Sequence, residues 1–244
     1  MPYRKNQFIN NEIYHVILRG IDENAIFKNI DDYYRMIFSI YEFNNTIATT
    51  IQNKREIRMN FKKKNRGRAS IVEMIDERDK LVEILSFCFM PNHIHLLLRQ
   101  IKDNGITKFM AKVGTGYGGY FNRKYKRKGY VFQNRFKDIP IKDDNQLKIV
   151  FIYIHANPIS LIEPVWKEKG IQYPEKVNNF LEEKYKWSSY ADYIGKKNFP
   201  SVTEREFLLN VIGGVEGCKE AINNWIMHKN DLHKFSNILL DSKK

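Results

Sequence analysis

The stretch Leu81–Arg99, LVEILSFCFMPNHIHLLLR, decides the fold of this 244-residue chain. It holds two apolar runs, Leu81–Met90 and His93–Arg99, and only Pro91-Asn92 separates them. Two runs of this length and composition, joined by residues that favour turns, predict an antiparallel β-hairpin. Both runs are far too short to cross a bilayer, so no membrane contact is expected.

Outward from this hairpin, the chain alternates between strand and helix signals. Apolar residues at helical spacing behind an Asp cap predict one helix, and Asp143-Asp144 cap another that ends before Asn157-Pro158. Proline cannot donate a ladder hydrogen bond, so Pro140 predicts that the short strand around it lies at a sheet edge. The predicted elements are strand Glu12–Gly20, helix Asp31–Asn45, the hairpin, helix Asn104–Arg127, strand Phe136–Lys142 and helix Asp143–Ala156. This order predicts an α+β fold, a ferredoxin-like antiparallel sheet with helices on its faces.

Two further regions surround this core of about residues 1–163. A polar and basic segment from Thr46 to Arg68 begins an insertion at about 46–80, which is either solvated surface or an arm that contacts DNA. Residues 164–244 form a small helical appendage. In it, Lys186–Tyr190 is expected to dock on the core by its aromatic residues, and Thr203–Glu206 to form a capping box for a helix that ends at Gly213-Gly214.

Charge and cysteine content narrow the class of protein. Lys and Arg number 41 against 28 Asp and Glu, a formal net charge of +13, which favours a polyanionic partner because neutralised phosphates release counterions. The alternative is a protein that is merely rich in lysine. Cys88 and Cys218 are the only cysteines and are far apart, which excludes a disulfide framework and fits the reducing cytoplasm. The N-terminus lacks the apolar stretch of a signal peptide.

Two short patterns carry candidate chemistry. His93 and His95 leave the same side of a predicted strand, so both imidazoles can face one metal ion. Tyr153 and Asn157 share a helix face, where a phenol can act as a nucleophile and an amide oxygen as a ligand for a hard cation. Each pair alone also fits ordinary strand and helix packing. His15 is left as a strand residue of unassigned role.

Several blocks of the sequence together resemble a known family. Met90–Leu98 (MPNHIHLLL) resembles the HUH motif, His-hydrophobic-His, of single-tyrosine transposases. More closely, the chain resembles the REP-associated tyrosine transposases, relatives of insertion-sequence transposases that move as single-stranded DNA. The other matching blocks, in order, are Tyr14–Gly20, Tyr120–Tyr125 with Gly129–Lys137, Tyr153–Pro158 and Trp187–Tyr190.

The resemblance implies an HUH nuclease core and a role for each matching residue. It makes Tyr153 the nucleophile, His93 and His95 the metal-binding pair, and Asn157 the third ligand of Mg²⁺ or Mn²⁺. It implies cleavage and rejoining of single-stranded or hairpin DNA through a 5′-phosphotyrosine, by a monomer or a homodimer. His155 departs from the family, in which glutamate is usual, but it lies about 200° around the helix from Tyr153.

Basic residues interleaved with aromatic ones are candidates for DNA binding. Positive charge follows phosphates and aromatic rings offer stacking faces for unpaired bases, although some of these rings could equally face the core. The candidates are Arg19, Arg123, Lys124, Lys126, Arg127, Lys128, Arg135 and Lys137.

Three other functions stay open at this stage. The first is a ferredoxin-like nucleic-acid-binding protein without catalysis. The second is a metal-dependent hydrolase that uses water, and the third is a purely structural basic protein.

Overall fold

The computed structural model describes residues 7–47, 56, 59, 76, 78–133 and 135–227. It contains one four-stranded antiparallel sheet in the order β2-β3-β1-β4. The strands are β1 (Ile13–Arg19), β2 (Val82–Met90), β3 (His93–Gln100) and β4 (Lys137–Pro140). With helices α1 (Ile30–Glu42) and α3 (Gly105–Lys124), they follow one another as β1-α1-β2-β3-α3-β4. This is the predicted ferredoxin-like arrangement, and β4 lies at an edge as Pro140 indicated. Most of the predicted insertion lies outside the described residues.

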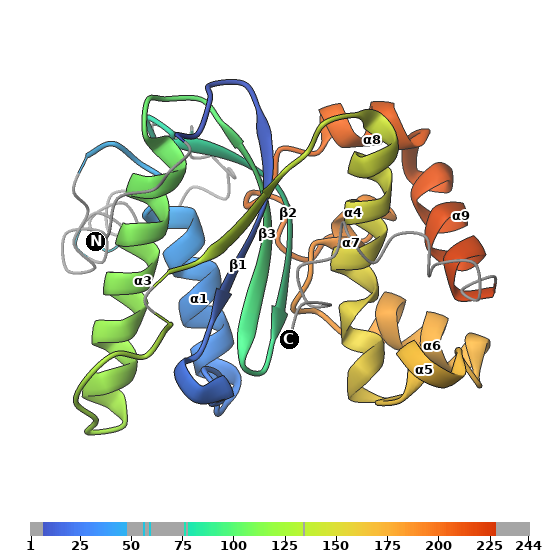
Figure 1. Ribbon diagram of the computed structural model, residues 1–244, viewed down its shortest axis with the longest axis horizontal. Coiled ribbons are helices and arrows are strands. Elements are labelled where there is room, and N and C mark those ends of the chain that lie inside the picture. The colour runs from blue at the N-terminus through green and yellow to red at the C-terminus, as the bar shows by residue number, and fades with distance from the viewer. Residues whose placement is uncertain are drawn as a thin grey trace, which may run out of the picture.

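Helices lie on both faces of the sheet (Figure 1). Alternate residues of the strands enter two separate apolar layers. On one face, side chains such as Val16 and Leu96 pack with α1 and α3. On the other, Leu97, Cys88 and Met90 pack with α4 (Asp144–Ala156) and with the C-terminal helices. Because side chains alternate along a strand, the odd-numbered residues His15, His93 and His95 fall on the α4 face.

The helix ends confirm some of the predicted caps and correct others. Asp143 caps α4 as predicted, accepting a hydrogen bond from the Gln146 amide. The first helix is capped by Asn29 in a capping box with Asp32, two residues before the expected Asp31. The Thr203 capping box was a wrong prediction. No side chain caps α8 (Glu206–Ile212), and the Thr203 hydroxyl accepts from Arg205 instead.

Helix α3 is continuous although Gly114, Gly116, Gly118 and Gly119 lie in its interior, where glycine lowers helix propensity. Gly116 has a packing reason, because a Cβ there would collide with the ring of Phe43 at the end of α1. Close approach of α1 and α3 therefore compensates for the low helix propensity of glycine at this position.

The C-terminal part covers the α4 face and one sheet edge (Figure 1). The Trp187–Ser189 segment docks on β2 as predicted: the Phe89 amide donates to the Trp187 carbonyl at 2.9 Å, and the Trp187 ring stacks on Tyr33. The other elements are η1 (Ile21–Glu23), η2 (Asn157–Leu161), α5 (Trp166–Lys169), α6 (Pro174–Asn179), η3 (Phe180–Lys184), α7 (Tyr190–Tyr193) and α9 (Gly214–Met227). Within the described ranges, none of these helices has the length and apolar character needed to cross a membrane.

Candidate active site

His93 and His95 converge at the start of β3, directly after the Pro91-Asn92 turn. They leave the α4 face of the sheet, and their Nε2 atoms lie 2.9 Å apart. His95 is fully buried and His93 is 8% exposed. The spacing in the sequence therefore predicted the convergence of the two imidazoles correctly.

His15 joins this pair from the neighbouring strand, and the sequence analysis assigned it no role. Its Nε2 lies 3.0 Å from the Nδ1 of His95, and the two rings stack with centroids 5.2 Å apart. The β1–β3 pairing places Ile17 opposite His95, so His15 is a diagonal neighbour of His95 on the same face. The sequence signal was present, since His15 sits at an inward position of a strand, but strand pairing was needed to interpret it.

Asn92 holds the other end of the histidine pair. Its side-chain Oδ1 lies 2.6 Å from the Nδ1 of His93. An amide oxygen only accepts hydrogen bonds, so the Nδ1 of His93 carries a hydrogen and its Nε2 is left with a lone pair. Both histidines thus present Nε2, and neither presents Nδ1, to the space between them.

Tyr153 reaches the same cluster from helix α4. The centroid of its ring lies 5.7 Å from that of His95 and 6.0 Å from that of His15, both in edge-on geometry. Only 3% of the residue is exposed. From α5, the Nζ of Lys167 lies 5.8 Å from the centroid of the Tyr153 ring. The structure therefore brings the predicted nucleophile and the histidine pair together.

Asn157 lies one helical turn beyond Tyr153, where α4 ends and η2 begins. Its side chain is buried, and its Nδ2 donates to the Tyr153 carbonyl at 2.8 Å. That bond leaves the amide oxygen Oδ1 as the atom with which Asn157 could contact a cation. The predicted common helix face of Tyr153 and Asn157 agrees with this placement.

The side chains around Tyr153 fit a divalent cation. Two neutral imidazole nitrogens that face each other at hydrogen-bond distance, with an amide oxygen on the adjoining helix, offer nitrogen and oxygen donors. Among the residues that the structure describes, no group of three or more His, Cys, Asp or Glu side chains could hold an ion.

Two of the predicted DNA-binding residues lie on the face of the histidine cluster. Arg19 is paired with His93 across β1 and β3, and Lys137 is paired with Ile17 across β1 and β4. Directly opposed residues of antiparallel strands point to the same side of a sheet. The side chains of Arg19 and Lys137 therefore flank the α4 face near Tyr153, and Lys137 is exposed.

The basic residues at the end of α3 lie on the α1–α3 side of the sheet. They differ in their exposure and in their partners. Lys124 is committed to packing, because its Nζ lies 2.7 Å from the Asp32 carboxylate and 2.9 Å from the Tyr120 hydroxyl. Phe121 is buried, whereas Tyr130 is 80% exposed. Exposed cations that could reach a ligand are Arg123, Lys126 and Lys128, with Arg135 beyond the turn, while Arg127 is half-buried over the Phe121 ring.

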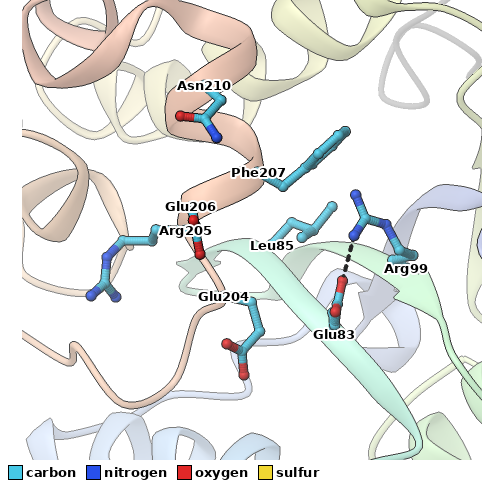
Figure 2. A pocket seen from close by; sticks show the side chains of 8 residues that line it. All are labelled: Glu83, Leu85, Arg99, Glu204, Arg205, Glu206, Phe207 and Asn210. Carbon is cyan, nitrogen blue, oxygen red and sulfur yellow. Dashed lines mark hydrogen bonds and ion pairs between the residues drawn. The ribbon is translucent and has the colours of Figure 1, made fainter.

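A separate surface pocket of about 420 Å³ lies at the other end of the hairpin (Figure 2). Arg99 lines one side of it, paired with Glu83 at 2.7 Å and lying over the Phe207 ring at 4.0 Å. None of the predicted site residues lines this pocket.

The fold and the site together define a class: a ferredoxin-like domain with two histidines on the central strand β3 and a tyrosine on helix α4, which follows the edge strand β4. Residues 39–157 match the family model described as "Transposase IS200 like". This segment includes His93, His95, Tyr153 and Asn157, and the match confirms the resemblance that the motifs predicted. A transposase role follows at the level of this family. His15 lies outside the matched segment.

The chain also has a weak likeness to a solved structure. A solved structure described as "Structure of the REP associates tyrosine transposase bound to a REP hairpin" is 13% identical, covers 84% of this chain and 96% of its own, and has a TM-score of 0.44. A likeness at this level does not bear on substrate or mechanism. No curated protein matches the sequence.

Proposed function

We propose that this protein is a divalent-metal-dependent transposase that cleaves and rejoins single-stranded DNA with Tyr153 as nucleophile. The observation that carries this proposal is the convergence of the His93 and His95 Nε2 atoms, 2.9 Å apart, beside the ring of Tyr153. Hairpin-forming repeats are the substrate class that the family resemblance implies.

In the proposed reaction, the Tyr153 hydroxyl attacks the scissile phosphorus in line. A Tyr–O–P bond forms, the P–O3′ bond breaks, and the products are a 5′-phosphotyrosine and a free 3′-hydroxyl. The phenolic proton leaves Tyr153 and the departing 3′-oxygen takes up a proton. The covalent bond keeps the energy of the phosphodiester, so a 3′-hydroxyl can reverse the step and join strands without a nucleotide cofactor.

His93 and His95, with Asn157, would hold Mg²⁺ or Mn²⁺. Such an ion, when bound, supplies a Lewis acid that orients and polarises a phosphate oxygen. Arg19 and Lys137 would bind neighbouring phosphates, because both flank the α4 face of the sheet. The exposed cations near the end of α3, with Tyr130, would contact DNA further from the scissile phosphate.

Lys167 is a cation beside the proposed nucleophile. A phenol has an ordinary pKa of about 10 and is a poor nucleophile at neutral pH. The Lys167 ammonium lies 5.8 Å from the centroid of the Tyr153 ring, where it would stabilise negative charge that develops on the phenolic oxygen during the attack.

The test uses a single-stranded oligonucleotide that contains a hairpin, labelled at both ends and incubated with Mn²⁺ or with EDTA. Denaturing electrophoresis should reveal a protein–DNA adduct that needs Mn²⁺ and is absent in Tyr153→Phe. Tyr173→Phe, which changes an exposed tyrosine, is the matched control and should form the adduct normally.

The other outcomes distinguish the remaining functions. Cleavage that survives in Tyr153→Phe would exclude the covalent mechanism and favour a hydrolase that uses water. Binding of several hairpins without cleavage, with either metal, would favour the catalytically inactive nucleic-acid-binding protein.

A further inference from the structure

Three hydrogen bonds link Asn92, His93, His95 and His15 into one chain. Their lengths are 2.6 Å from Asn92 Oδ1 to His93 Nδ1, 2.9 Å between the two Nε2 atoms, and 3.0 Å from His95 Nδ1 to His15 Nε2. The direction of the chain follows from Asn92, which accepts. With neutral rings, His93 Nε2 then accepts from His95 Nε2, and His95 Nδ1 accepts from the N–H of His15 Nε2.

A cation held by both Nε2 atoms needs the opposite tautomer of His95. The ion takes the lone pair of His95 Nε2, so the hydrogen of neutral His95 has to sit on Nδ1. That N–H then needs an acceptor in the same place. His15 can supply one, because a neutral imidazole donates or accepts at Nε2 according to which of its nitrogens carries the hydrogen.

We propose that His15 is a positioning residue of the metal site, which holds His95 through Nδ1 and thereby directs the Nε2 lone pair of His95 to the ion. This inference rests on the proposed function. Partners of this kind behind a ligating imidazole fix its tautomer and orientation, and their loss typically weakens metal binding about 10- to 100-fold.

The surroundings of His15 make this role specific. His15 and His95 are both 0% exposed, so water cannot readily replace the bond. The bond joins adjacent strands that are hydrogen-bonded along their whole length, so the two rings are held in register by the sheet. His15 is also close to Tyr153, with ring centroids 6.0 Å apart, which raises a competing role as a base toward the phenol. Metal affinity separates the two roles, since a base toward Tyr153 would leave Mn²⁺ binding unchanged.

The experiment measures Mn²⁺ binding to the full-length protein without DNA, by following the electron paramagnetic resonance signal of free Mn²⁺ at one fixed pH. We expect His15→Leu to weaken binding about 10- to 100-fold. We expect His15→Gln to stay within about threefold of the wild type, since its side-chain amide can donate or accept near the position of Nε2. His155→Leu removes another fully buried imidazole from the same layer and should not change the affinity.

A second measurement reads the tautomers directly. Selective ¹⁵N labelling of the six histidines, with and without saturating Mg²⁺, should show the His95 hydrogen moving from Nε2 to Nδ1. In His15→Gln the same shift should occur, so this readout holds even if His15→Leu fails to fold.

The outcomes separate this inference from the proposed function. If His93→Ala abolishes Mn²⁺ binding while folded His15→Leu and His15→Gln both bind like the wild type, His15 has no positioning role and the proposed function stands. If His155→Leu weakens binding as much as His15→Leu, the effect is general destabilisation and the inference fails. If the wild type binds neither Mn²⁺ nor Mg²⁺, the metal-dependent function itself is wrong.

Discussion

A buried polar cluster lies on each face of the sheet. The two clusters differ in whether a ligand can replace their hydrogen bonds. On the α1–α3 face, both oxygens of Asp32 are occupied by partners, which are the Lys28 and Asn29 amides, the Tyr120 and Tyr125 hydroxyls and the Lys124 ammonium. Burial alone raises the pKa of the Asp32 carboxyl, but these hydrogen bonds outweigh it and the pKa lies below its ordinary value. Asp32 is a permanent carboxylate that fastens α1 to α3.

On the α4 face, the buried atoms are imidazole nitrogens that bond to one another. The bond between the two Nε2 atoms uses the lone pair of His93 Nε2. A cation bound by both Nε2 atoms can replace this bond once His95 carries its hydrogen on Nδ1, without leaving a buried group unsatisfied. Burial alone therefore does not distinguish structural from functional polar groups. The distinction lies in whether their hydrogen bonds can be exchanged for a ligand.

The largest expected effect is on DNA cleavage, through the histidine cluster of the α4 face. His93→Ala should lower DNA cleavage at least about 1000-fold, because a ligand of a Lewis acid worth several kcal/mol is lost. The free energy of unfolding should change by less than about 1 kcal/mol, since His93 lies at the edge of the layer beside a turn. Cleavage kinetics and urea unfolding of the same preparation check both statements. Normal cleavage by this variant would show that His93 does not hold an ion needed for the reaction.

The next largest effect should fall on stability alone. Asp32→Ala removes a helix cap and leaves two tyrosines and Lys124 without their acceptor, so the free energy of unfolding should drop by about 3 kcal/mol. Urea unfolding measures this drop. Asp31→Ala, at an exposed neighbour in the same helical turn, should cost less than about 0.5 kcal/mol. The folded Asp32→Ala protein should cleave DNA at the normal rate, and a defect there would show that the two faces are coupled.

A fourth histidine on the α4 face, His155, makes the stability of this layer depend on pH. Burial lowers the pKa of His155 to about 3, and its Nε2 lies 2.8 Å from the Ser189 hydroxyl. Below pH 6.5 the unfolded chain takes up a proton there while the folded chain stays neutral. His155 should therefore reduce the free energy of unfolding by about 1.4 kcal/mol per pH unit as the pH falls from about 6.5 toward 3.

His155→Gln isolates that contribution. Between pH 5.5 and 4.5 its free energy of unfolding should fall less steeply than that of the wild type, while the carboxylates titrate alike in both. Equal slopes would mean that His155 is not held neutral by burial.

The smallest expected effect concerns the rim of the active site. Lys167→Gln removes the cation beside Tyr153 and should slow adduct formation about fivefold, which corresponds to about 1 kcal/mol for an exposed charge. Lys169→Gln, on the same short helix, should have no effect in the same single-turnover assay. The effect should shrink at high salt, and a salt-independent defect would indicate lost packing instead.

Many features followed from local sequence. Two apolar runs joined by the turn residues Pro91-Asn92 predicted the hairpin, and Asp143-Asp144 marked the start of α4. The i, i+2 spacing of His93 and His95 and the i, i+4 spacing of Tyr153 and Asn157 predicted their shared faces, because side-chain direction within one element depends only on its period. The Thr203 cap failed because α8 begins only at Glu206. A tertiary contact holds the chain before it, since the Glu204 amide donates to the Ile84 carbonyl of β2 at 2.9 Å.

The sequence by itself therefore determined the order of elements, the family resemblance and the residues of the proposed chemistry. Only the tertiary structure decided what surrounds them. Strand pairing brought His15 to His95, helix packing placed Lys167 beside Tyr153, and the α1–α3 contact committed Lys124 to Asp32. Such contacts join residues distant in the chain, and no local period encodes which of them meet.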